Sequence, residues 1–200
     1  MKRTVPLLLF ACCVPFVYAG YDDGLISAGE YEWAVDWLNG TLVVDGGGAY
    51  RIEARNFSRI EVWSTSTPLG TGVGGIMDLV IGHNVRLDYH GGETEELTIG
   101  RNATAYLYGG RIDYITNMQF TVTTQSDAHI NIYCQNGWSW LYTGDEISGI
   151  TGLWNDGSAF SIDFINHPDF DPAWTNINVM PEPATLLLLG LGGLMARRKN

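Results

Sequence analysis

Lysine is almost missing from this chain, and the shortage of cations limits its partners. It occurs only near the two ends, at Lys2 and Lys199. Between residues 20 and 180 the chain has 6 arginines and 21 acidic side chains, a formal charge of −15. A domain with this charge repels phosphate backbones, so we expect no nucleic-acid partner. The acidity is explained by surface solvation or by attraction for divalent cations.

Cysteine is also scarce, which excludes a disulfide framework. Of the 3 cysteines, Cys12 and Cys13 lie in an expected export signal and leave with it. Cys134 then has no partner in an oxidising compartment, so we expect a buried, inert thiol, with an intermolecular bridge as the alternative. The exported part, about 160 residues, is long enough for one domain with its own core.

Helical periodicity and known catalytic motifs are missing as well. No segment of twelve or more residues between 41 and 179 has a helical period. There is no Gly-x-Ser-x-Gly elbow, and the glycines of 70–75 precede a strand rather than the helix that a dinucleotide site needs. The histidines have no metal-ligand spacing; they are His83, His90, His129 and His167. We therefore expect a non-enzymatic protein with no catalytic residue and no resident metal.

The first residues have the three regions of a secretory signal peptide. Lys2 and Arg3 precede an apolar run over 5–18, and small residues follow it. This pattern predicts a signal peptide over 1–19 with cleavage after Ala19. A lipoprotein signal ending at Cys12 is the alternative, although the phenylalanine at position 10 fits such a signal poorly.

The last residues, 180–200, also have three parts in a fixed order. Pro181, Glu182 and Pro183 come first, an apolar run over 184–196 follows, and Arg197 and Arg198 close it. The prolines stop a helix from running backward, and the basic end stays on the cytoplasmic side of a membrane. An apolar helix over 184–196 is short for a bilayer, which needs about 20 residues. The segment is either a single-span anchor or a signal that is read in the membrane and then removed.

This tail resembles the PEP-CTERM sorting signal of Gram-negative and related bacteria. The resemblance covers about residues 180–199 and implies cleavage near Pro181–Pro183 by a membrane-embedded exosortase. It also implies export through the inner membrane, transient anchoring there by the C-terminal helix, and delivery to the cell surface or extracellular matrix. Hosts of such proteins often make exopolysaccharide, which is a candidate partner. The family is defined by its tail, so the resemblance implies nothing about the fold of residues 21–179.

An internal repeat is the strongest indication of the fold. Residues 79–92 align with residues 97–110 without a gap, at an offset of 18. Leucine, isoleucine, asparagine and a closing glycine pair coincide in the two copies. A fainter copy matches Asn56 to Asn84 at an offset of 28, with the excess assigned to an insertion over 64–75. Another matches Asn117 to Asn102 at an offset of 15.

Apolar and polar residues alternate within each copy, so each predicted strand has one buried face that only stacked copies can cover. We predict an all-β fold: a short parallel β-solenoid of about 18-residue coils over 41–124, then a Trp-rich β cap or small sheet over 125–179. We also expect Asn84 and Asn102 to form a side-chain ladder at a corner. A β-sandwich is the alternative fold, and residues 30–38 are either a helical turn or an edge strand.

Two sets of side chains are candidates for binding or chemistry. Trp138, Trp140 and Tyr142 share one strand face; exposed, they make a flat strip for stacking sugar rings, and buried, they are core. Carboxylates held about 5–9 Å apart can cleave a glycoside. The sequence does not choose among the candidates Glu93, Glu95, Glu96, Asp113, Asp145 and Glu146.

The first three of these acids share one turn, which leaves calcium as the one cofactor to consider. The sequence thus predicts an exported protein of unknown molecular activity. A polysaccharide-binding module is the alternative, and a glycan-active enzyme is the third hypothesis.

Overall fold

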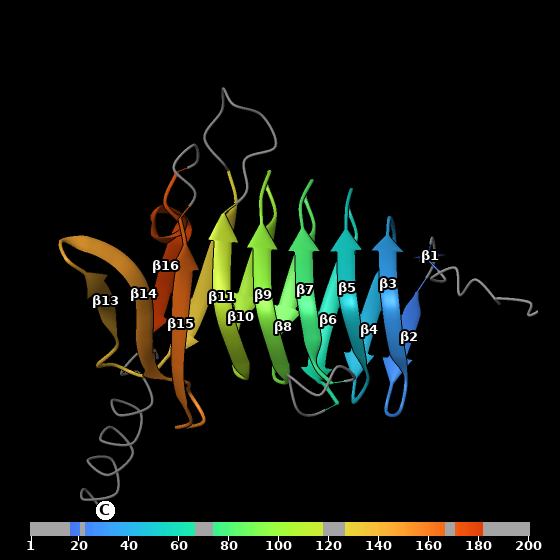
Figure 1. Cartoon of the computed structure of the whole chain (residues 1–200), viewed down its shortest axis with the longest axis horizontal. Helices are drawn as coiled ribbons and strands as arrows, with labels where there is room; N and C mark the ends of the chain where they lie inside the picture. Colours follow the sequence, from blue (N-terminus) through green and yellow to red (C-terminus); the bar gives the residue numbers. More distant parts are fainter. Residues whose placement is uncertain (1–16, 21–22, 67–73, 118–126, 167–170, 182–200) are drawn as a thin grey trace, which may run out of the picture.

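The computed structural model describes residues 17–20, 23–66, 74–117, 127–166 and 171–181, which form an all-β structure of two facing sheets (Figure 1). Sheet A contains, in spatial order, β1 (Val17–Gly20), β3 (Tyr31–Trp37), β5 (Gly48–Ala54), β7 (Ile76–Ile81), β9 (Glu93–Ile99), β11 (Arg111–Asn117), β15 (Ala159–Ile165), β14 (Glu146–Leu153) and β13 (Ser139–Thr143). Sheet B contains β16 (Ile177–Pro181), β12 (His129–Cys134), β10 (Thr104–Leu107), β8 (Arg86–Tyr89), β6 (Arg59–Ser64), β4 (Thr41–Asp45) and β2 (Gly24–Ser27).

Consecutive strands alternate between the two sheets from β1 to β12, and every neighbouring pair among them is parallel. The chain therefore returns to the same sheet at every second strand and lies beside its previous passage. The antiparallel pairs β13–β14 and β14–β15 end this pattern in sheet A, and β16 returns to sheet B beside β12. Residues 31–37, which the sequence left undecided, are strand β3 in the same alternation.

The repeat found in the sequence corresponds to the hydrogen-bonded register of the sheets. Leu79 of β7 pairs with Leu97 of β9, and Ile81 pairs with Ile99. On the other sheet, Leu87 of β8 pairs with Ala105 of β10. Each of these pairs has the sequence offset of the repeat, so the repeat places equivalent side chains directly above one another.

The two fainter copies do not have the predicted register. Ile52 pairs with Leu79 and Ile60 with Leu87, which is a sequence offset of 27 in both cases. The match of Asn56 to Asn84 requires an offset of 28. Asn117 pairs with Ile99 in sheet A, which contradicts its predicted match with Asn102. In both copies an asparagine was matched to an asparagine, whereas backbone pairing aligns the strands by their inward-facing side chains.

The core lies between the sheets and is mainly aliphatic. Leu79, Ile81, Leu87, Leu97 and Ile99 are all fully buried. No single strand covers these side chains; the facing sheet and the neighbouring units do so together, as expected for stacked units. The free cysteine, Cys134, is also buried in this core, and burial raises the pKa of its thiol. This confirms the prediction of a buried thiol.

The corners use positive backbone φ, but the predicted asparagine ladder does not form. Asn84 and Asn102 have φ values of 67° and 56°, and their side chains point to solvent. The residues before the two asparagines make the contact between neighbouring units instead: Nη1 of Arg101 lies 2.5 Å from Nε2 of His83. Since the asparagines are exposed, water satisfies their amides and a ladder brings no gain.

The C-terminal part covers the end of the core. Trp154 is buried and its indole N–H donates to the carbonyl of Gly110 over 2.8 Å. A hairpin turn at residues 155–157 joins β14 to β15, with Gly157 at a φ of 87°. A short 3₁₀ helix, η1 (Ala173–Asn176), then leads into β16. The amide of Asn176 donates to the carbonyl of Ala128 over 2.7 Å and so ties η1 to sheet B.

The targeting segments lie largely outside the described residues. Within the described ranges, no helix is long and apolar enough to cross a membrane. The predicted C-terminal hydrophobic helix and most of the signal peptide are not among these residues. Ala19 is described and lies in β1 opposite Asp36 of β3, so cleavage after Ala19 would leave only Gly20 of that strand.

Candidate functional site

The strands of sheet A share a local bend on their outer face. In β5, β7, β9 and β11 two adjacent residues face outward between two buried ones; the pairs are Tyr50 and Arg51, Met77 and Asp78, Glu95 and Glu96, and Asp113 and Tyr114. The backbone pairing skips the first residue of each pair in all three strand-to-strand ladders. The bend therefore repeats in register and places two parallel rows of side chains on the surface.

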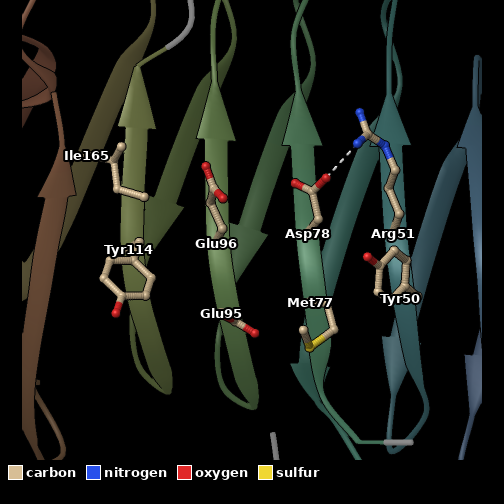
Figure 2. Close-up of a pocket in the computed structure, with 8 residues that line it drawn as sticks. All are labelled: Tyr50, Arg51, Met77, Asp78, Glu95, Glu96, Tyr114 and Ile165. Atoms are coloured by element: carbon tan, nitrogen blue, oxygen red, sulfur yellow. Dashed lines mark hydrogen bonds and ion pairs between the residues drawn. The ribbon is translucent and has the colours of Figure 1, made fainter. Parts of the chain in front are cut away.

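A hollow of about 370 Å³ lies over these rows. We call it the sheet A hollow. Figure 2 shows Tyr50 and Arg51 on one side and Tyr114 and Ile165 on the other, with a floor from β7 and β9 between them. The floor residues are Met77, Asp78, Glu95 and Glu96.

One wall of the hollow includes the ring of Tyr50, which stacks on Trp33. The rings of Trp33 and Tyr50 are parallel within 5° and their centroids are 4.6 Å apart. Trp33 lies on β3 and the floor begins on β7, on opposite sides of β5. The face of Tyr50 that Trp33 leaves uncovered is therefore turned toward the hollow. Tyr50 is 43% exposed and Tyr114, across the hollow, is 38% exposed.

The floor carries more negative than positive charge. Arg51 donates to Asp78 over 2.7 Å and to Glu53 over 3.2 Å, so one guanidinium serves two carboxylates. Glu96 pairs with Asp78 in the ladder between β7 and β9 and accepts hydrogen bonds from Thr98 and Thr116 at 3.2 and 2.7 Å. The hollow is thus lined by three carboxylates, those of Asp78, Glu95 and Glu96, and by one guanidinium, that of Arg51.

Burial is the main cause that raises the pKa of Asp78 above its ordinary value. The neighbouring charge of Arg51 lowers this pKa, while Glu96 and Glu53 raise it further. The net rise means that the charged form of Asp78 is less stable here than in water. A positive group entering the hollow would offset this cost.

The predicted aromatic strip in the C-terminal part has a different geometry. Trp138 and Trp140 are partly buried against the core, and their rings meet at 79° with centroids 5.2 Å apart. Tyr142 is 61% exposed. The two tryptophans therefore pack edge to face and do not form one flat surface. The sugar-stacking role of this strip stays a prediction.

A second aromatic row lies on sheet B. The rings of Trp63, His90, Tyr108 and Tyr133 stack in this order, with centroids 3.9, 4.9 and 4.6 Å apart. These residues hold the same place in four successive units, so their faces lie against one another. Trp63, at the end of the row, is exposed, while His90, Tyr108 and Tyr133 are partly buried, which suits a structural role more than a binding role.

The other predicted carboxylates are spread over the surface. Arg111 donates to Asp113 over 2.7 Å, and its Nη1 lies 3.9 Å from Glu93. Asp145 and Glu146 are exposed at the turn between β13 and β14. Among the residues that the structure describes, no group of three or more His, Cys, Asp or Glu side chains is arranged to hold a metal ion. His167 lies outside those residues.

Sequence reasoning alone missed most of the hollow. It named Glu95 and Glu96 as carboxylates, but it did not name Trp33, Tyr50, Arg51, Asp78 or Tyr114. The strand register would have revealed them, because it pairs Arg51 with Asp78 and Asp78 with Glu96.

Comparison with known families gives one match, in the tail. Residues 181–199 match the PEP-CTERM protein-sorting motif. The match includes all the predicted sorting residues, namely Pro181, Glu182, Pro183, Arg197 and Arg198. The motif supports an exported protein with membrane-associated sorting and an exosortase as its processing partner. No curated protein and no solved structure gives a significant match to the chain.

Proposed function

We propose that this protein is a non-enzymatic component of the cell surface or extracellular matrix, delivered there by exosortase sorting. One observation carries the proposal: the sorting motif begins at Pro181, which is also the last residue of β16. The folded domain and its sorting motif are thus joined without a spacer. This arrangement fits a domain that is held close to the membrane and released when the tail is cut.

We further assign the exported domain to the short parallel β-solenoids. Support comes from the alternation of strands between two parallel sheets and from the recurring register of β7 with β9 and of β8 with β10. Such stacks are built from nearest-neighbour contacts and offer long surfaces of repeated side chains. These properties suit a protein whose task is to present a surface outside the cell.

Localisation in the native host tests the main proposal. We expect the chain in the surface or extracellular fraction, without its signal peptide and without the residues that follow the Pro-Glu-Pro segment. Deletion of the exosortase should leave the tail uncut and the protein in the inner membrane. Replacement of Pro181, Glu182 and Pro183 by alanine should have the same effect. An intact chain in the cytosol would contradict the proposal.

Polysaccharide binding is the second candidate, favoured by the sheet A hollow. A tyrosine face backed by Trp33, with carboxylates beside it, matches the usual needs of a sugar ring: an apolar platform and polar acceptors. Binding of the host's exopolysaccharide should be lost on Tyr50→Ala. The C-terminal strip is tested in the same assay by Trp138→Ala with Trp140→Ala.

Catalysis of glycan cleavage is less well supported. Asp78 and Glu96 lie on adjacent strands, as a carboxylate pair would, but Arg51 holds the first and two threonines hold the second. Burial raises the pKa of Asp78, as a general acid requires, but one of its carboxylate oxygens is held by Arg51, whose charge opposes that rise. Release of sugar that is abolished by Asp78→Asn or Glu96→Gln would instead establish an enzyme.

A further inference from the structure

We propose that the sheet A hollow binds a cationic saccharide, a chain of amino sugars that carry free amino groups. The inference rests on the saccharide-binding function proposed above and adds the charge of the ligand. It follows from three properties of the hollow: its aromatic wall, its excess of carboxylates, and its length across the sheet.

The aromatic wall is built before any ligand arrives. Because Trp33 stacks on Tyr50, the tyrosine ring is held upright and its uncovered face is directed over Met77. A fixed ring loses little conformational entropy on binding. The face of an aromatic ring attracts both the C–H groups of a sugar and a positive charge placed over it.

The floor selects the sign of the ligand. Asp78, Glu95 and Glu96 line the hollow together with one guanidinium, that of Arg51, which Asp78 shares with Glu53. Glu95 has no hydrogen bond or ion pair with any other residue that the structure describes, so its charge is available. The excess negative charge repels uronic acids and sulfated sugars and attracts ammonium groups.

A metal ion fits the same place less well. Two of the three floor carboxylates already have partners, and Tyr50, Met77, Tyr114 and Ile165 supply no carboxylate. Calcium takes 6–8 oxygen ligands, more than this floor offers. An amino sugar uses the rings and the carboxylates together, whereas a bare cation uses only the carboxylates.

The length of the hollow suits an oligomer. Tyr50 on β5 and Tyr114 on β11 are separated by three strand-to-strand steps, about 14 Å at the usual spacing of neighbouring strands. A short saccharide lying across the strands would place one end ring on each tyrosine. Its amino groups would then meet the carboxylates of β7 and β9 between the two tyrosines (Figure 2).

The test compares two probes with the same sugar backbone, whose amino groups are free and charged in one and acetylated and neutral in the other. The full chain, purified in mild detergent, is titrated by calorimetry with a glucosamine trimer and with its fully N-acetylated counterpart. We expect the glucosamine trimer to bind about tenfold more tightly at low salt, a difference that two exposed ion pairs can supply. About 1 M salt should reduce this ratio to near one.

Matched variants locate the site. Glu95→Gln should lower the affinity for the glucosamine trimer several-fold and leave the N-acetylated trimer unchanged. Glu146→Gln removes the same charge from an exposed turn outside the hollow and should change neither affinity. Tyr50→Ala should weaken both trimers. Because Glu95 has no partner among the described residues, its replacement should not disturb folding.

The outcomes separate the two proposals. Equal affinity for the two trimers, both weakened by Tyr50→Ala, would overturn the charge assignment and keep saccharide binding. Binding of neither trimer would overturn the amino-sugar assignment, and binding of the host's exopolysaccharide that is lost on Tyr50→Ala would still keep saccharide binding. If Glu95→Gln and Glu146→Gln reduce the preference for the glucosamine trimer equally, that preference comes from the charge of the whole domain. This result would overturn the assignment to the hollow.

Discussion

Cys134 and Pro181 are paired residues on neighbouring strands of sheet B, so the first residue of the sorting motif belongs to the folded domain. Among the strands that the structure describes, β16 is an edge strand of sheet B and has β12 as its one neighbour. Ile177 and Val179 of β16 lie beside Ile130 and Ile132, which are fully buried. Cutting the chain within β16 would therefore expose core residues, whereas cutting after Pro181 would not.

The first prediction concerns the C-terminus of the native protein. Mass spectrometry of the protein from its host should find the last residue at or shortly after Pro181, because a shorter chain loses part of β16. A chain truncated before Ile177 should unfold at a lower temperature than a chain ending at Pro181. A native protein ending upstream of Ile177 would contradict this view of the boundary.

Much of the fold could be predicted because the residues that repeat in the sequence are those whose side chains face the core. Leu79 and Leu97 are identical, as are Ile81 and Ile99, and their spacing in the sequence is the strand register. Apolar side chains in stacked units occupy equivalent places between the two sheets. The alternation of these side chains within a strand, and their spacing from one copy to the next, therefore indicate both the direction of the strands and their pairing.

Where the prediction was wrong, one polar residue had been used as the guide. Asn56 has a φ of 62°, but in the register of β6 with β8 it takes the place of His83 and not of Asn84. Both corner positions of the later units have positive φ, so asparagine is suited to either one. An asparagine at a corner therefore indicates a turn without fixing the register.

The sheet A hollow was beyond sequence reasoning for a geometric reason. Its walls come from β5 and β11, and the chain passes through β7 and β9 between Arg51 and Tyr114. The bend that turns adjacent residues outward breaks the two-residue alternation, so Tyr50 and Arg51 do not read as a strand face. Strand pairing was needed to bring these residues together.

The second prediction tests the tight approach of neighbouring units at the glycine turns. Gly110 has a φ of 82°, and a Cβ there would lie 2.7 Å from the carbonyl oxygen of Gly92. Gly110→Ala should lower the free energy of unfolding by about 2–4 kcal/mol, through backbone strain and overpacking together. Gly137 also has positive φ, 102°, but apart from its chain neighbours no atom of the described residues lies within 4 Å of its Cβ position. Chemical denaturation of Gly137→Ala should show only the strain, about 1–2 kcal/mol.

The third prediction concerns a buried carboxylate on sheet B. Asp88 accepts hydrogen bonds from Arg59 at 2.9 Å and from two nitrogens of Arg86 at 2.8 Å each. Asp88→Asn removes its charge from these bonds and should cost about 1.5–3 kcal/mol in urea unfolding. Asp113 is held by Arg111 in the same way but is more exposed, so Asp113→Asn should cost less than about 1 kcal/mol. Equal losses would show that burial of Asp88 adds nothing.

Asp88 also gives the protein a dependence on acid. Burial raises its pKa, but the hydrogen bonds from Arg86 and Arg59 outweigh burial and hold the pKa below the ordinary value. The stabilisation is complete above the unfolded pKa of about 4 and is lost as pH falls through the lower folded pKa. The Asp88→Asn variant should therefore lose less stability than the parent when both are acidified below about pH 4.

The last prediction concerns the corner between β7 and β8, where His83 accepts a hydrogen bond from Arg101. Burial, and then the positive charges of Arg101 and Arg55, lower the pKa of His83. The unfolded chain takes up this proton near pH 6.5, before the folded chain does, so stability should fall as pH drops from about 7 through the lowered pKa.

His83→Asn keeps a residue that tolerates positive φ and removes the titrating ring. In this variant, thermal unfolding between about pH 7 and 5 should depend less on pH than in the parent, because one proton-linked step is gone. His129→Asn, at an exposed position at the start of β12, is the control for replacing a histidine by asparagine outside this corner. If both variants respond as the parent does, the contact between Arg101 and His83 does not couple this corner to pH.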